Sequence, residues 1–522
     1  MIYLLSQIID KSAERFPDRE AFRFEKRSIT FSQLFEKTNQ LAGLLVARGV
    51  RRGDRVGVFM NRSFETAIAI HGILKAGAAY VPLAPFAPPA RTRFLLEDCG
   101  IRNIITEPSQ QSALRKVMSP EVKVDNVIGL EHNEFTNAVS WAEVSQFPGD
   151  RPPDVRVLAD DLAYVMYTSG TTGVPKGIMH THYSGLSYAK LSADLYAVNE
   201  TDRFANHAAI HFDISTFGYF SAPLAGAATV ILSEGHTKFP VSLSKLMEDE
   251  GITIWYSVPA ALSQLLQFGT LEKRDLNSLR WVLFGGEPFH PKHLRALMAL
   301  WPQAKFSNVY GPAEVNQCTY YNFSSPPDTD DPIPLGVVWD DTEMIIVDDQ
   351  EQPVESGEVG ELLIRSATRM QGYWGQAELT RKAFYQRVRI QGCPEIFYRT
   401  GDLVRLDESG VLHFLGRRDR QIKTRGYRVE LDEVEAALMT HPHVEEAAVF
   451  TTVNNTGEKI IEARVICKNG QTLLDATGLQ AHLQNLLPSY AIPLKIGFSD
   501  NLPRTEAGKI DRKELERNET HS

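Results

Sequence analysis

The chain has 522 residues, of which 43% are hydrophobic and 23% charged, a globular composition whose length predicts at least two domains. The net charge of −10 and an isoelectric point near 5.8 argue against nucleic acid or an anionic membrane as a partner, because both need a clustered basic surface. The four cysteines form no CxxC pair, which indicates neither a zinc ribbon nor a disulfide framework and fits a reducing compartment, the cytoplasm.

The N-terminal segment does not have the pattern of a targeting sequence. Asp10 and Lys11 stand where a signal peptide would continue its apolar core, and no run of about 18 apolar residues predicts a membrane span. A strand–helix–strand pattern follows. "DRVGVFM" (54–60) predicts a buried strand, "SFETAIAIHGILKAG" (63–77) a helix and "AAYVPL" (78–83) the next strand.

The same alternation returns in the middle of the chain. Strands are predicted over 252–259, 279–286 and 304–312, with a helix over 290–302 between the last two. Strand–helix alternation predicts an α/β fold with largely parallel sheets, and ligands of such sheets bind beyond the carboxyl ends of the strands. Polar loops fall at these ends, over 168–177, 211–215, 285–288 and 310–314.

The pattern changes after about residue 330. Short strands separated by Gly and Asp turns predict a small β-rich, barrel-like subdomain, and the strongly charged stretch "GRRDRQIKTRGYRVEL" (416–431) marks a boundary. Beyond it, two helices and two strands predict an α+β unit. We therefore expect a large N-terminal domain over 1–415 and a small C-terminal domain over 420–522, joined by residues 416–419.

The loop "YTSGTTGVPKG" (167–177) follows an apolar strand, a common setting for a phosphate site. A Walker A loop needs G-x-x-x-x-G-K-[ST]. Counted from Gly170, Pro175 replaces the second glycine and Gly177 replaces the Ser/Thr, so the P-loop hypothesis fails. Hydroxyls and glycine N–H groups still suit phosphate oxygens. Judged from composition alone, an ordinary surface connector is about as well supported as a phosphate site.

A series of motifs distributed along the chain carries a stronger signal. In order, they are "LKAGAAYVPL" (74–83), "YTSGTTGVPKG", "FDIS" (212–215), "NVYGPAE" (308–314), "GELLIRS" (360–366), "YRTGDLV" (398–404), "GRRDRQIKTRGYRVEL" and "PRTEAGKIDR" (503–512). This series resembles the adenylate-forming superfamily of acyl-CoA ligases, luciferases and the adenylation domains of nonribosomal peptide synthetases. It is most similar to the amino-acid-activating members, and the resemblance covers essentially the whole chain.

The resemblance implies a reaction in two halves, with ATP and Mg²⁺. A carboxylate attacks the α-phosphate of ATP to give an acyl-adenylate and pyrophosphate, and a thiol then forms a thioester and releases AMP. The first half brings two anions together and needs positive charge more than a nucleophilic side chain. The ATP-binding residues that the resemblance implies are Thr168, Ser169, Gly170, Thr171, Thr172, Gly173, Lys176, Gly286, Asn308, Tyr310, Gly311, Asp402 and Arg417.

Two lysines are the implied catalytic residues. Lys509 matches the family lysine that contacts both the substrate carboxylate and the phosphate, although an isolated lysine on a Gly turn would ordinarily be solvated. Lys176 would assist by steadying the β- and γ-phosphates that leave as pyrophosphate, under a clamp formed by the loop. Glu314 resembles the magnesium ligand, an oxygen donor of the kind that a hard cation bridging phosphates requires.

The resemblance also implies three residues that bind the nucleoside part of ATP. Tyr310 resembles the tyrosine stacked on adenine, Asp402 the aspartate that holds the ribose hydroxyls, and Arg417 an arginine near ribose and phosphate. Taken alone, Tyr310 would more often belong to a core and Asp402 to an Asx turn. One departure stands out, since Ala313 replaces the threonine that commonly precedes Glu314 in the family.

Domain movement is also implied. Asp419 matches the hinge aspartate about which the C-terminal domain rotates between the half-reactions, and such lid motions can limit turnover. One face of that domain would present Lys509, and the other would present the segment around Gly426 to form a tunnel for the thiol.

Asp213 in "HFDISTF" identifies the substrate as an amino acid, because the family aspartate at this place binds the ammonium group. A carboxylate among apolar residues is costly to bury unpaired, and a ligand cation would satisfy it. The alternative is a helix N-cap. His207 and His211 with Asp213 also mimic a metal cluster, which the lack of further histidines disfavours.

The residues at the remaining pocket positions favour a substrate with a small or slender side chain, such as alanine, glycine or serine. The substrate-binding residues implied are Asp213, Ile214, Phe217, Ser257, Val282, Phe284, Val309, Gln317, Cys318 and Lys509, with 282 and 284 taken from a gap-free alignment. Two phenylalanines would fill much of the pocket. No acid beyond Asp213 is available to pair with a basic substrate side chain. A β-amino acid is still compatible with the site, because its ammonium group can reach the same carboxylate.

The chain ends thirteen residues after Lys509 without a carrier-protein segment, so we expect a free-standing enzyme. Its partner would be a discrete carrier protein with a phosphopantetheine arm, or coenzyme A. An acyl-CoA or aryl-CoA ligase is the alternative enzyme. A nucleotide-binding scaffold without chemistry is the non-enzymatic alternative, against which Lys509, Glu314 and Asp402 argue.

Overall fold

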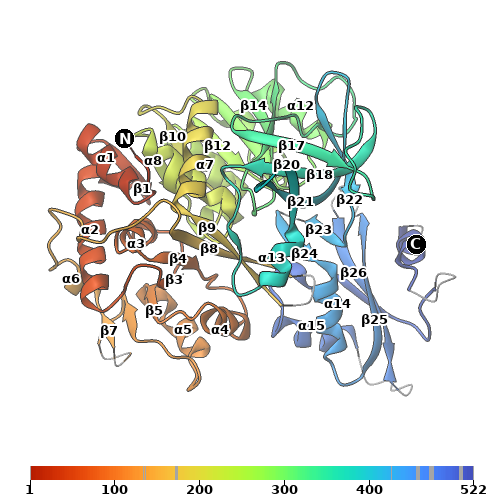
Figure 1. Cartoon of the computed structure of the whole chain (residues 1–522), viewed down its shortest axis with the longest axis horizontal. Coiled ribbons are helices and arrows are strands. Elements are labelled where there is room, and N and C mark those ends of the chain that lie inside the picture. Colours follow the sequence, from red (N-terminus) through yellow and green to blue (C-terminus); the bar gives the residue numbers. More distant parts are fainter. Residues whose placement is uncertain are drawn as a thin grey trace.

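The structure is a computed structural model that describes residues 2–132, 135, 137–170, 174–424, 426–453, 459–468, 475–504 and 510–520. Two large sheets form the left and upper parts of the molecule in Figure 1, and a smaller α+β lobe lies at the right. Among the described residues, no helix combines the length and the apolar character needed to cross a membrane.

The first sheet is built from the N-terminal strand–helix repeats. Its order is β19 (Gly372–Tyr373), β9 (Lys176–Thr181), β8 (Leu162–Thr168), β4 (Ala79–Pro82), β3 (Arg55–Phe59), β5 (Asn103–Thr106), β6 (Asn126–Ile128) and β7 (Ala138–Val139). The strands from β8 to β7 pair in parallel, whereas β9 and β19 are antiparallel additions. The strands predicted over 54–60 and 78–83 are confirmed as β3 and β4.

The second sheet contains the strands predicted in the middle of the chain. Its order is β16 (Val337–Val338), β15 (Thr319–Phe323), β14 (Lys305–Tyr310), β13 (Trp281–Gly285), β12 (Ile254–Ser257), β10 (Arg203–Asn206), β11 (Ala228–Ile231), β1 (Glu20–Phe24) and β2 (Arg27–Thr30). Strands β14, β13, β12, β10, β11 and β1 run parallel, so their carboxyl ends share one edge. The predicted α/β class is confirmed.

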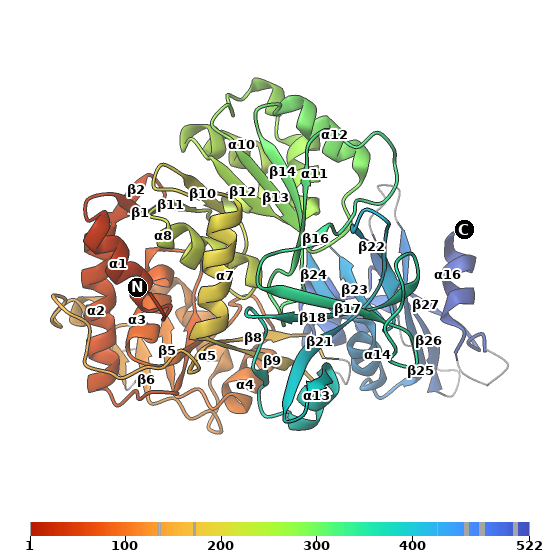
Figure 2. The ribbon, with the colours of Figure 1, turned by 45° about the horizontal axis from the view of Figure 1, so that its top comes forward.

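Helices separate and cover these two sheets. They are α1 (Gln7–Arg15), α2 (Phe31–Ala47), α3 (Phe64–Lys75), α4 (Pro89–Asp98), α5 (Gln111–Val117), α6 (Trp141–Val144), α7 (His182–Leu195), α8 (Ala222–Leu224), α9 (Glu234–Lys238), α10 (Pro240–Asp249), α11 (Pro259–Phe268), α12 (Pro291–Leu300) and α13 (Ala377–Ala383). Helix α3 contacts β1 of the second sheet and β3 and β4 of the first, and α7 lies between the two sheets in Figure 2. Capping boxes at Thr30, Ser63 and Thr181 begin α2, α3 and α7.

The β-rich part expected after residue 330 is an antiparallel sheet. Its order is β17 (Thr342–Val347), β18 (Val359–Ser366), β21 (Cys393–Leu406) and β20 (Phe384–Ile390), and β22 (Leu412–Arg417) also pairs with β21. Its inner face packs with Tyr310, Val315 and Cys318 from the end of β14 and the loop beyond it. This packing ties the small sheet to the edge where the ligand loops gather.

The chain from Gln421 onward forms a separate unit, which we call the C-terminal lobe. It contains the hairpin β23 (Gln421–Thr424)–β24 (Tyr427–Glu430), α14 (Leu431–Met439), β25 (Val444–Val453), β26 (Lys459–Cys467), α15 (Ala476–Gln484), β27 (Lys495–Phe498) and α16 (Arg512–Thr520). These elements bury a cluster of their own, which includes Val434, Leu438, Val449 and Leu483. The predicted helices and strands are thus confirmed, while the exact boundaries at 415 and 419 stay predictions.

Candidate active site

A cavity of about 430 Å³ lies where the carboxyl ends of the parallel strands meet the C-terminal lobe. Its walls include Ser169 after β8, His211–Ile214 beyond β10, Gly286 after β13 and Gly311–Ala313 after β14. The polar loops predicted at the strand ends therefore surround one space. The C-terminal lobe contributes Lys423, Gly426, Tyr427, Arg428 and Tyr490 to the same walls.

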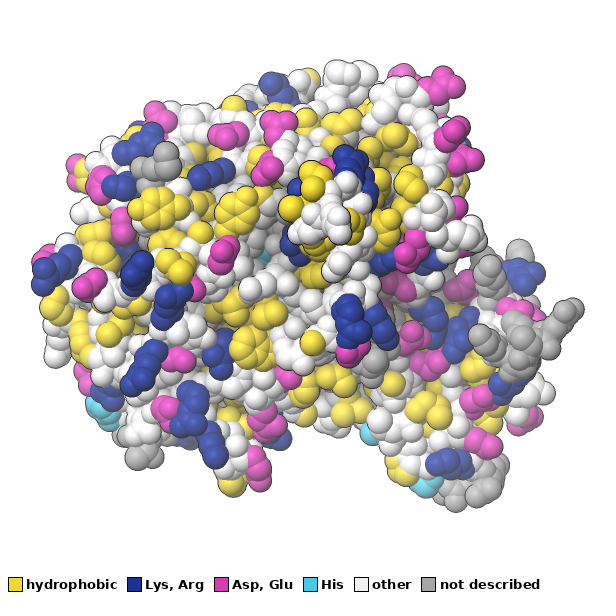
Figure 3. Space-filling view, in the orientation of Figure 1, with side chains coloured by type: hydrophobic (Ala, Val, Ile, Leu, Met, Phe, Trp, Pro, Cys, Tyr) yellow, Lys and Arg dark blue, Asp and Glu magenta, His cyan; other side chains and the backbone are white. Residues whose placement is uncertain are grey.

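The cavity lining carries charges of both signs, among them Lys423, Arg428, Asp213 and Glu234. In Figure 3, Lys and Arg side chains are interspersed with Asp and Glu over the face drawn, rather than gathered in one basic area.

Asp213 lies in the cavity wall on a short 3-10 turn, Asp213–Ser215. Its Oδ1 accepts a hydrogen bond from the N–H of Ile214 at 2.9 Å. No cation lies within ion-pair distance of it among the described residues, although Lys423 and Arg428 attract it from further away. Burial raises the pKa of this carboxyl. The capping position of the turn is Phe212, so the structure gives the N-cap interpretation no support.

The two histidines near Asp213 do not form a metal site with it. Burial lowers the pKa of His207 to about 3 and that of His211 to about 4, so both imidazoles are neutral at pH 7. No group of three metal-binding side chains occurs in the part of the chain that the structure describes. Asp213 is instead a lone carboxylate facing a cavity.

Other predicted pocket residues divide into two groups. Ile214, Ser257, Val309 and Gln317 line the cavity with Asp213. Phe217, fully buried, lies directly behind this wall in a cluster with Val309 and Ile214. Cys318 is also fully buried, and its thiol lies 3.6 Å from the backbone oxygen of Tyr310.

The placement of Val282 and Phe284 in the pocket is corrected by the structure. Side chains alternate between the two faces of a strand, and Val282 and Phe284 pack on the far face of β13 in another core cluster. Trp281 and Leu283 are the residues on the face shared with Phe217. Both faces of β13 are buried, so its apolar sequence shows no alternation that could have indicated the correct face.

An acid besides Asp213 also lines the cavity. Glu234 at the start of α9 lies in its wall, and its Oε1 is 2.8 Å from Nη2 of Arg62. Because Arg62 already balances the charge of Glu234, this second acid does not change the prediction that no acid beyond Asp213 is available to a basic substrate.

Unpartnered polar atoms mark the part of the wall beside Asp213. Gln317 donates through Nε2 to the Tyr196 hydroxyl at 3.1 Å, while its Oε1 accepts nothing. Oδ1 of Asn316 and Oγ1 of Thr168 are also buried without a hydrogen-bond partner among the described residues. Buried polar atoms are normally satisfied, so these three unpartnered oxygens set this part of the fold apart. Asn316 was missed by the sequence reasoning.

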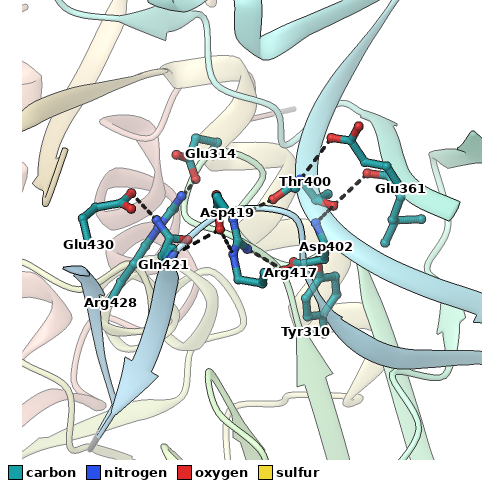
Figure 4. Close-up of polar contacts among 12 residues, drawn as sticks. Tyr310, Glu314, Glu361, Thr400, Asp402, Arg417, Asp419, Gln421, Arg428 and Glu430 are labelled. Atoms are coloured by element: carbon teal, nitrogen blue, oxygen red, sulfur yellow. Dashed lines mark hydrogen bonds and ion pairs between the residues drawn. The ribbon is translucent and has the colours of Figure 1, made fainter. Parts of the chain in front are cut away.

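Glu314 lies at the centre of the junction, with its side chain fully buried (Figure 4). Its Oε2 accepts a hydrogen bond from Nη1 of Arg428 at 2.6 Å, and its Oε1 accepts one from the Tyr373 hydroxyl at 2.8 Å. Nζ of Lys176 lies 3.5 Å from the same Oε1. Burial disfavours ionisation, but the charges of Arg428 and Lys176 outweigh it and hold the pKa of Glu314 well below its usual range.

The predicted nucleoside residues form a connected chain of polar contacts. The carboxylate of Asp402 accepts hydrogen bonds from the Tyr310 hydroxyl and from Arg417, and Arg417 also pairs with Asp419 (Figure 4). Nζ of Lys423, on β23, lies 5.7 Å from the centroid of the Tyr310 ring. The hairpin β23–β24 therefore covers the place where adenine was expected to stack.

The remaining ATP-binding candidates lie around that place. Gly286 and Gly311 line the cavity, whereas Asn308 is tied to the backbone oxygen of Pro334 at 2.7 Å. A Cβ at Gly311 would lie 1.9 Å from the backbone oxygen of Asn316, so only glycine fits there.

The described residues of the loop between β8 and β9 leave little space at Gly170. A Cβ at Gly170 would lie 1.9 Å from the backbone oxygen of Val174, and the Ser169 hydroxyl donates to the backbone oxygen of Arg428 at 3.0 Å. Lys176 begins β9 opposite Thr168. Three predicted loop residues, Thr171, Thr172 and Gly173, lie outside the described residues.

Lys509 also lies outside the described residues. The segments on either side of it are held in the C-terminal lobe. Arg504 pairs with Ile510 in a β-bridge and its guanidinium contacts Glu446, while Leu502 and Leu515 pack against β25. The face of the lobe that meets the cavity is the β23–β24 hairpin, the face expected around Gly426 for the thiol.

The surroundings of Glu314 show whether the residues present could hold a divalent cation through oxygen ligands. Mg²⁺ that accompanies ATP usually takes one or two carboxylates, with phosphates and waters as the other ligands. Glu314 is an ionised carboxylate, but its side chain is fully buried, does not line the cavity and already accepts hydrogen bonds from Arg428 and Tyr373. The hydroxyl of Thr168 is unpartnered among the described residues. The residues fit a cation that arrives with phosphate, and not one held by protein ligands alone.

Fold and site together define a nucleotide-dependent enzyme of the adenylate-forming type, and comparison with known proteins supports that class. The model of the AMP-binding enzyme family matches residues 9–374, and the model of its C-terminal domain matches residues 433–509. The chain therefore belongs to the AMP-binding enzyme family, and the resemblance to adenylation enzymes is confirmed.

Relatives narrow the class further. The chain is 35% identical over 512 residues to tyrocidine synthase 2 of Brevibacillus parabrevis, covering 98% of this chain but 14% of that protein. It is 31% identical to an L-proline–[L-prolyl-carrier protein] ligase of Pseudomonas fluorescens, covering 98% and 99%. A fused adenylation–PCP di-domain protein from Klebsiella oxytoca has the same fold, with TM-score 0.80, 25% identity and coverage of 95% and 93%.

Proposed function

We propose that this enzyme activates a small amino acid with ATP and transfers the aminoacyl group to the phosphopantetheine thiol of a separate carrier protein. The observation that carries the proposal is Asp213, a half-buried carboxylate in the cavity wall that has no partner within ion-pair distance among the described residues. The substrate ammonium would provide that partner. The relative of matching length is named as an amino acid–carrier protein ligase, which supports the same assignment.

In the first half-reaction, a carboxylate oxygen of the substrate attacks the α-phosphorus and the bond to the β-phosphate breaks. Asp213 would hold the ammonium group, so that the carboxylate is fixed relative to the phosphate. Lys176 would stabilise the charge of the departing pyrophosphate, and Lys509 would contact both reacting anions. A magnesium ion held by Glu314 would supply further neutralisation of the phosphate charge.

In the second half-reaction, the thiolate attacks the acyl carbon and the bond to the phosphate oxygen breaks, releasing AMP. The thiol proton passes to solvent. The observed arrangement, with Gly426 and Tyr427 in the cavity wall, supports a role of the hairpin in this step. The hinge at Asp419 and the domain limits 1–415, 416–419 and 420–522 belong to this proposal.

The choice of amino acid would depend on Ile214, Val309 and Gln317, which line the cavity with Asp213, and on Leu283, which packs in the cluster behind Val309. Because Phe284 lies outside the pocket, Phe217 is the one predicted phenylalanine that still supports a narrow pocket. The unpartnered Oε1 of Gln317 favours a substrate that offers a hydrogen-bond donor, such as serine, over a purely aliphatic one. A β-amino acid remains the second candidate, because its ammonium can still reach Asp213.

The decisive experiment is ATP–pyrophosphate exchange across a panel of α- and β-amino acids, fatty acids and aryl acids. Exchange that depends on one or a few small amino acids is the expected result. Exchange with a fatty or aryl acid alone would replace this proposal with the acyl-CoA ligase alternative. The acceptor is tested by offering the activated amino acid to phosphopantetheinylated carrier proteins and to coenzyme A.

A further inference from the structure

Strand β9 contacts the loop that follows β14, residues 311–317, which we call the β14 loop. Residues two apart on a strand point to the same face, and one face of β9 carries Lys176, Ile178 and His180. Nζ of Lys176 lies 3.5 Å from Oε1 of Glu314, and Ile178 packs in the same cluster as Val315. His180, 1% exposed, is the third member, and the chemistry above leaves it without a role.

The imidazole of His180 makes a polar contact at each of its nitrogens. Nε2 lies 2.9 Å from the backbone oxygen of Ala313, and Nδ1 lies 3.2 Å from Oγ of Ser184. A carbonyl oxygen only accepts, so Nε2 carries the hydrogen, and in the neutral ring Nδ1 accepts from the Ser184 hydroxyl. The ring of Tyr164 stacks on the imidazole with the centroids 4.8 Å apart. These contacts fix the ring and direct one N–H at one carbonyl.

Tyr164 holds a second point of the same loop. It stands opposite His180 on β8, and its hydroxyl accepts a hydrogen bond from Nδ2 of Asn316 at 3.4 Å. Asn316 has a left-handed backbone, with φ of 54°. A residue other than glycine keeps such a conformation only where its surroundings enforce it. The neighbouring imidazole and phenol thus fix the β14 loop at Ala313 and at Asn316.

The β14 loop forms a large part of the cavity wall. The loop residues that line the cavity are Gly311, Pro312, Ala313, Asn316 and Gln317. Its next two backbone oxygens are held as well, that of Glu314 by the N–H of Met370 and that of Val315 by the Thr368 hydroxyl, both at 2.7 Å. Three consecutive carbonyls therefore have partners, and His180 serves the one that belongs to a cavity-lining residue.

We propose that His180 is a positioning residue for the activation step, because its bond to the Ala313 carbonyl fixes the wall beside which the substrate carboxylate meets the α-phosphate. The inference rests on the proposed function, in which both reacting groups occupy this cavity. Ala313 has no polar side chain, so its backbone oxygen is the atom through which a hydrogen bond can hold it. A displacement of about 1 Å near reacting groups can lower a rate by about 10²-fold. The bond therefore affects turnover more than binding.

The test is ATP–pyrophosphate exchange by wild type, His180→Phe and His180→Gln, with ATP and the amino acid varied in turn. Phenylalanine keeps a ring against Tyr164 and removes both hydrogen bonds. Glutamine gives up the ring but places an amide N–H near the position of Nε2. His71→Phe is the matched control. His71 is also fully buried, and its Nε2 lies 3.0 Å from the backbone oxygen of Tyr219, which packs in a different core cluster from the β14 loop.

We expect His180→Phe to lower kcat by about 10- to 10²-fold, and to change the KM of either substrate less than it changes kcat. His180→Gln should recover most of the lost kcat, although it lacks the stacking on Tyr164. His71→Phe should lower the unfolding temperature as His180→Phe does and keep the wild-type kcat. The combination separates the bond to Ala313 from a general loss of packing.

A wild-type kcat in His180→Phe would overturn the inference, as would a kcat in His180→Gln as low as that in His180→Phe. Equal losses of kcat in His180→Phe and His71→Phe would also overturn it. If His180→Phe does not fold, His180→Asn takes its place, because its amide reaches Ser184 but not Ala313. The substrate is whichever acid supports exchange in the wild type. A fatty or aryl acid in that role would refute the proposed function, while the variants would still test His180.

Discussion

Nζ of Lys176 lies 3.5 Å from Oε1 of Glu314, and both side chains are buried. Burial lowers the pKa of Lys176, and Glu314 opposes that change. A cation is thus held at the base of the loop that we expect to close over phosphate. Its position at the first residue of β9 is fixed by pairing with Thr168 on β8, so the charge sits on a rigid element.

Lys176→Met should therefore reduce kcat/KM for ATP–pyrophosphate exchange by about 10²–10³-fold, the usual cost of one preorganised electrostatic group. Lys176→Arg should recover part of the activity. Lys245→Met, at an exposed helix position with local ion pairs, is the matched control. Exchange at the wild-type rate in Lys176→Met would show that the lysine is structural.

Asp213→Asn should raise the KM for the amino acid by about 10²-fold while changing the KM for ATP little, because it removes the charge that faces the ammonium. Exchange kinetics with each substrate varied in turn give both constants. Glu234→Gln is the control, since Glu234 lines the same cavity but already pairs with Arg62. Equal increases in both KM values would indicate that Asp213 only shapes the loop.

The same residue predicts a dependence of stability on pH. Its folded-state pKa is raised, so protonated Asp213 favours folding at low pH and this advantage is lost as the pH rises through the folded-state pKa. The unfolding free energies of wild type and Asp213→Asn should therefore converge at pH values below the ordinary pKa of an aspartate. They should separate at neutral pH, with the variant more stable by about 1–3 kcal/mol. A constant difference from pH 4 to 8 would contradict the raised pKa.

Leu283 and Phe284 provide a paired test of the substrate pocket. Leu283→Ala should change the ranking of amino acids in the exchange panel, because Leu283 lies on the face of β13 shared with Phe217 and Val309. Phe284→Leu should leave that ranking intact and lower stability, because Phe284 packs on the opposite face with Phe289 and Phe306. Buried truncations of this kind cost on the order of 1–3 kcal/mol. If Phe284→Leu changed the ranking and Leu283→Ala did not, the gap-free alignment that placed Phe284 in the pocket would be correct.

Lys509→Ala should abolish adenylate formation while leaving ATP binding largely intact, since its proposed contact is to reacting oxygens. Exchange assays and calorimetric titration with ATP measure the two properties separately. Lys495→Ala, an exposed lysine of the same lobe, serves as the control. Near wild-type exchange in Lys509→Ala would mean that the motif "PRTEAGKIDR" has been misassigned.

Much of the fold was predictable because its signals are local. The strand at 54–60, the helix at 63–77 and the strands of the second sheet follow from apolar periodicity and from Gly and Ser at their ends. Glu314, Asp402 and Arg417 were found by motif, and the structure brings them to one junction. Asp213 was also found through the resemblance, as the match to the family aspartate that binds the ammonium group.

What could not be predicted depends on contacts between distant segments. The gap-free alignment placed Val282 and Phe284 in the pocket, and the uniformly apolar sequence of β13 gave no alternation that could have shown that they lie on the other face of the strand. The partners of Arg428 and Glu234 lie more than 100 positions away along the chain. Asn316 has no sequence signal at all, since its importance comes from an oxygen left unpaired by the surrounding fold.

The cavity wall is shared between two bodies, with Asp213 and Val309 on one side and Tyr427 and Tyr490 on the other. If the lobe turns during each cycle, the chamber is complete for only part of the time. A small-molecule inhibitor shaped to the entire chamber would then select one stage of turnover. Its potency would rise with the occupancy of that stage, so it would act most strongly on enzyme that is actively working.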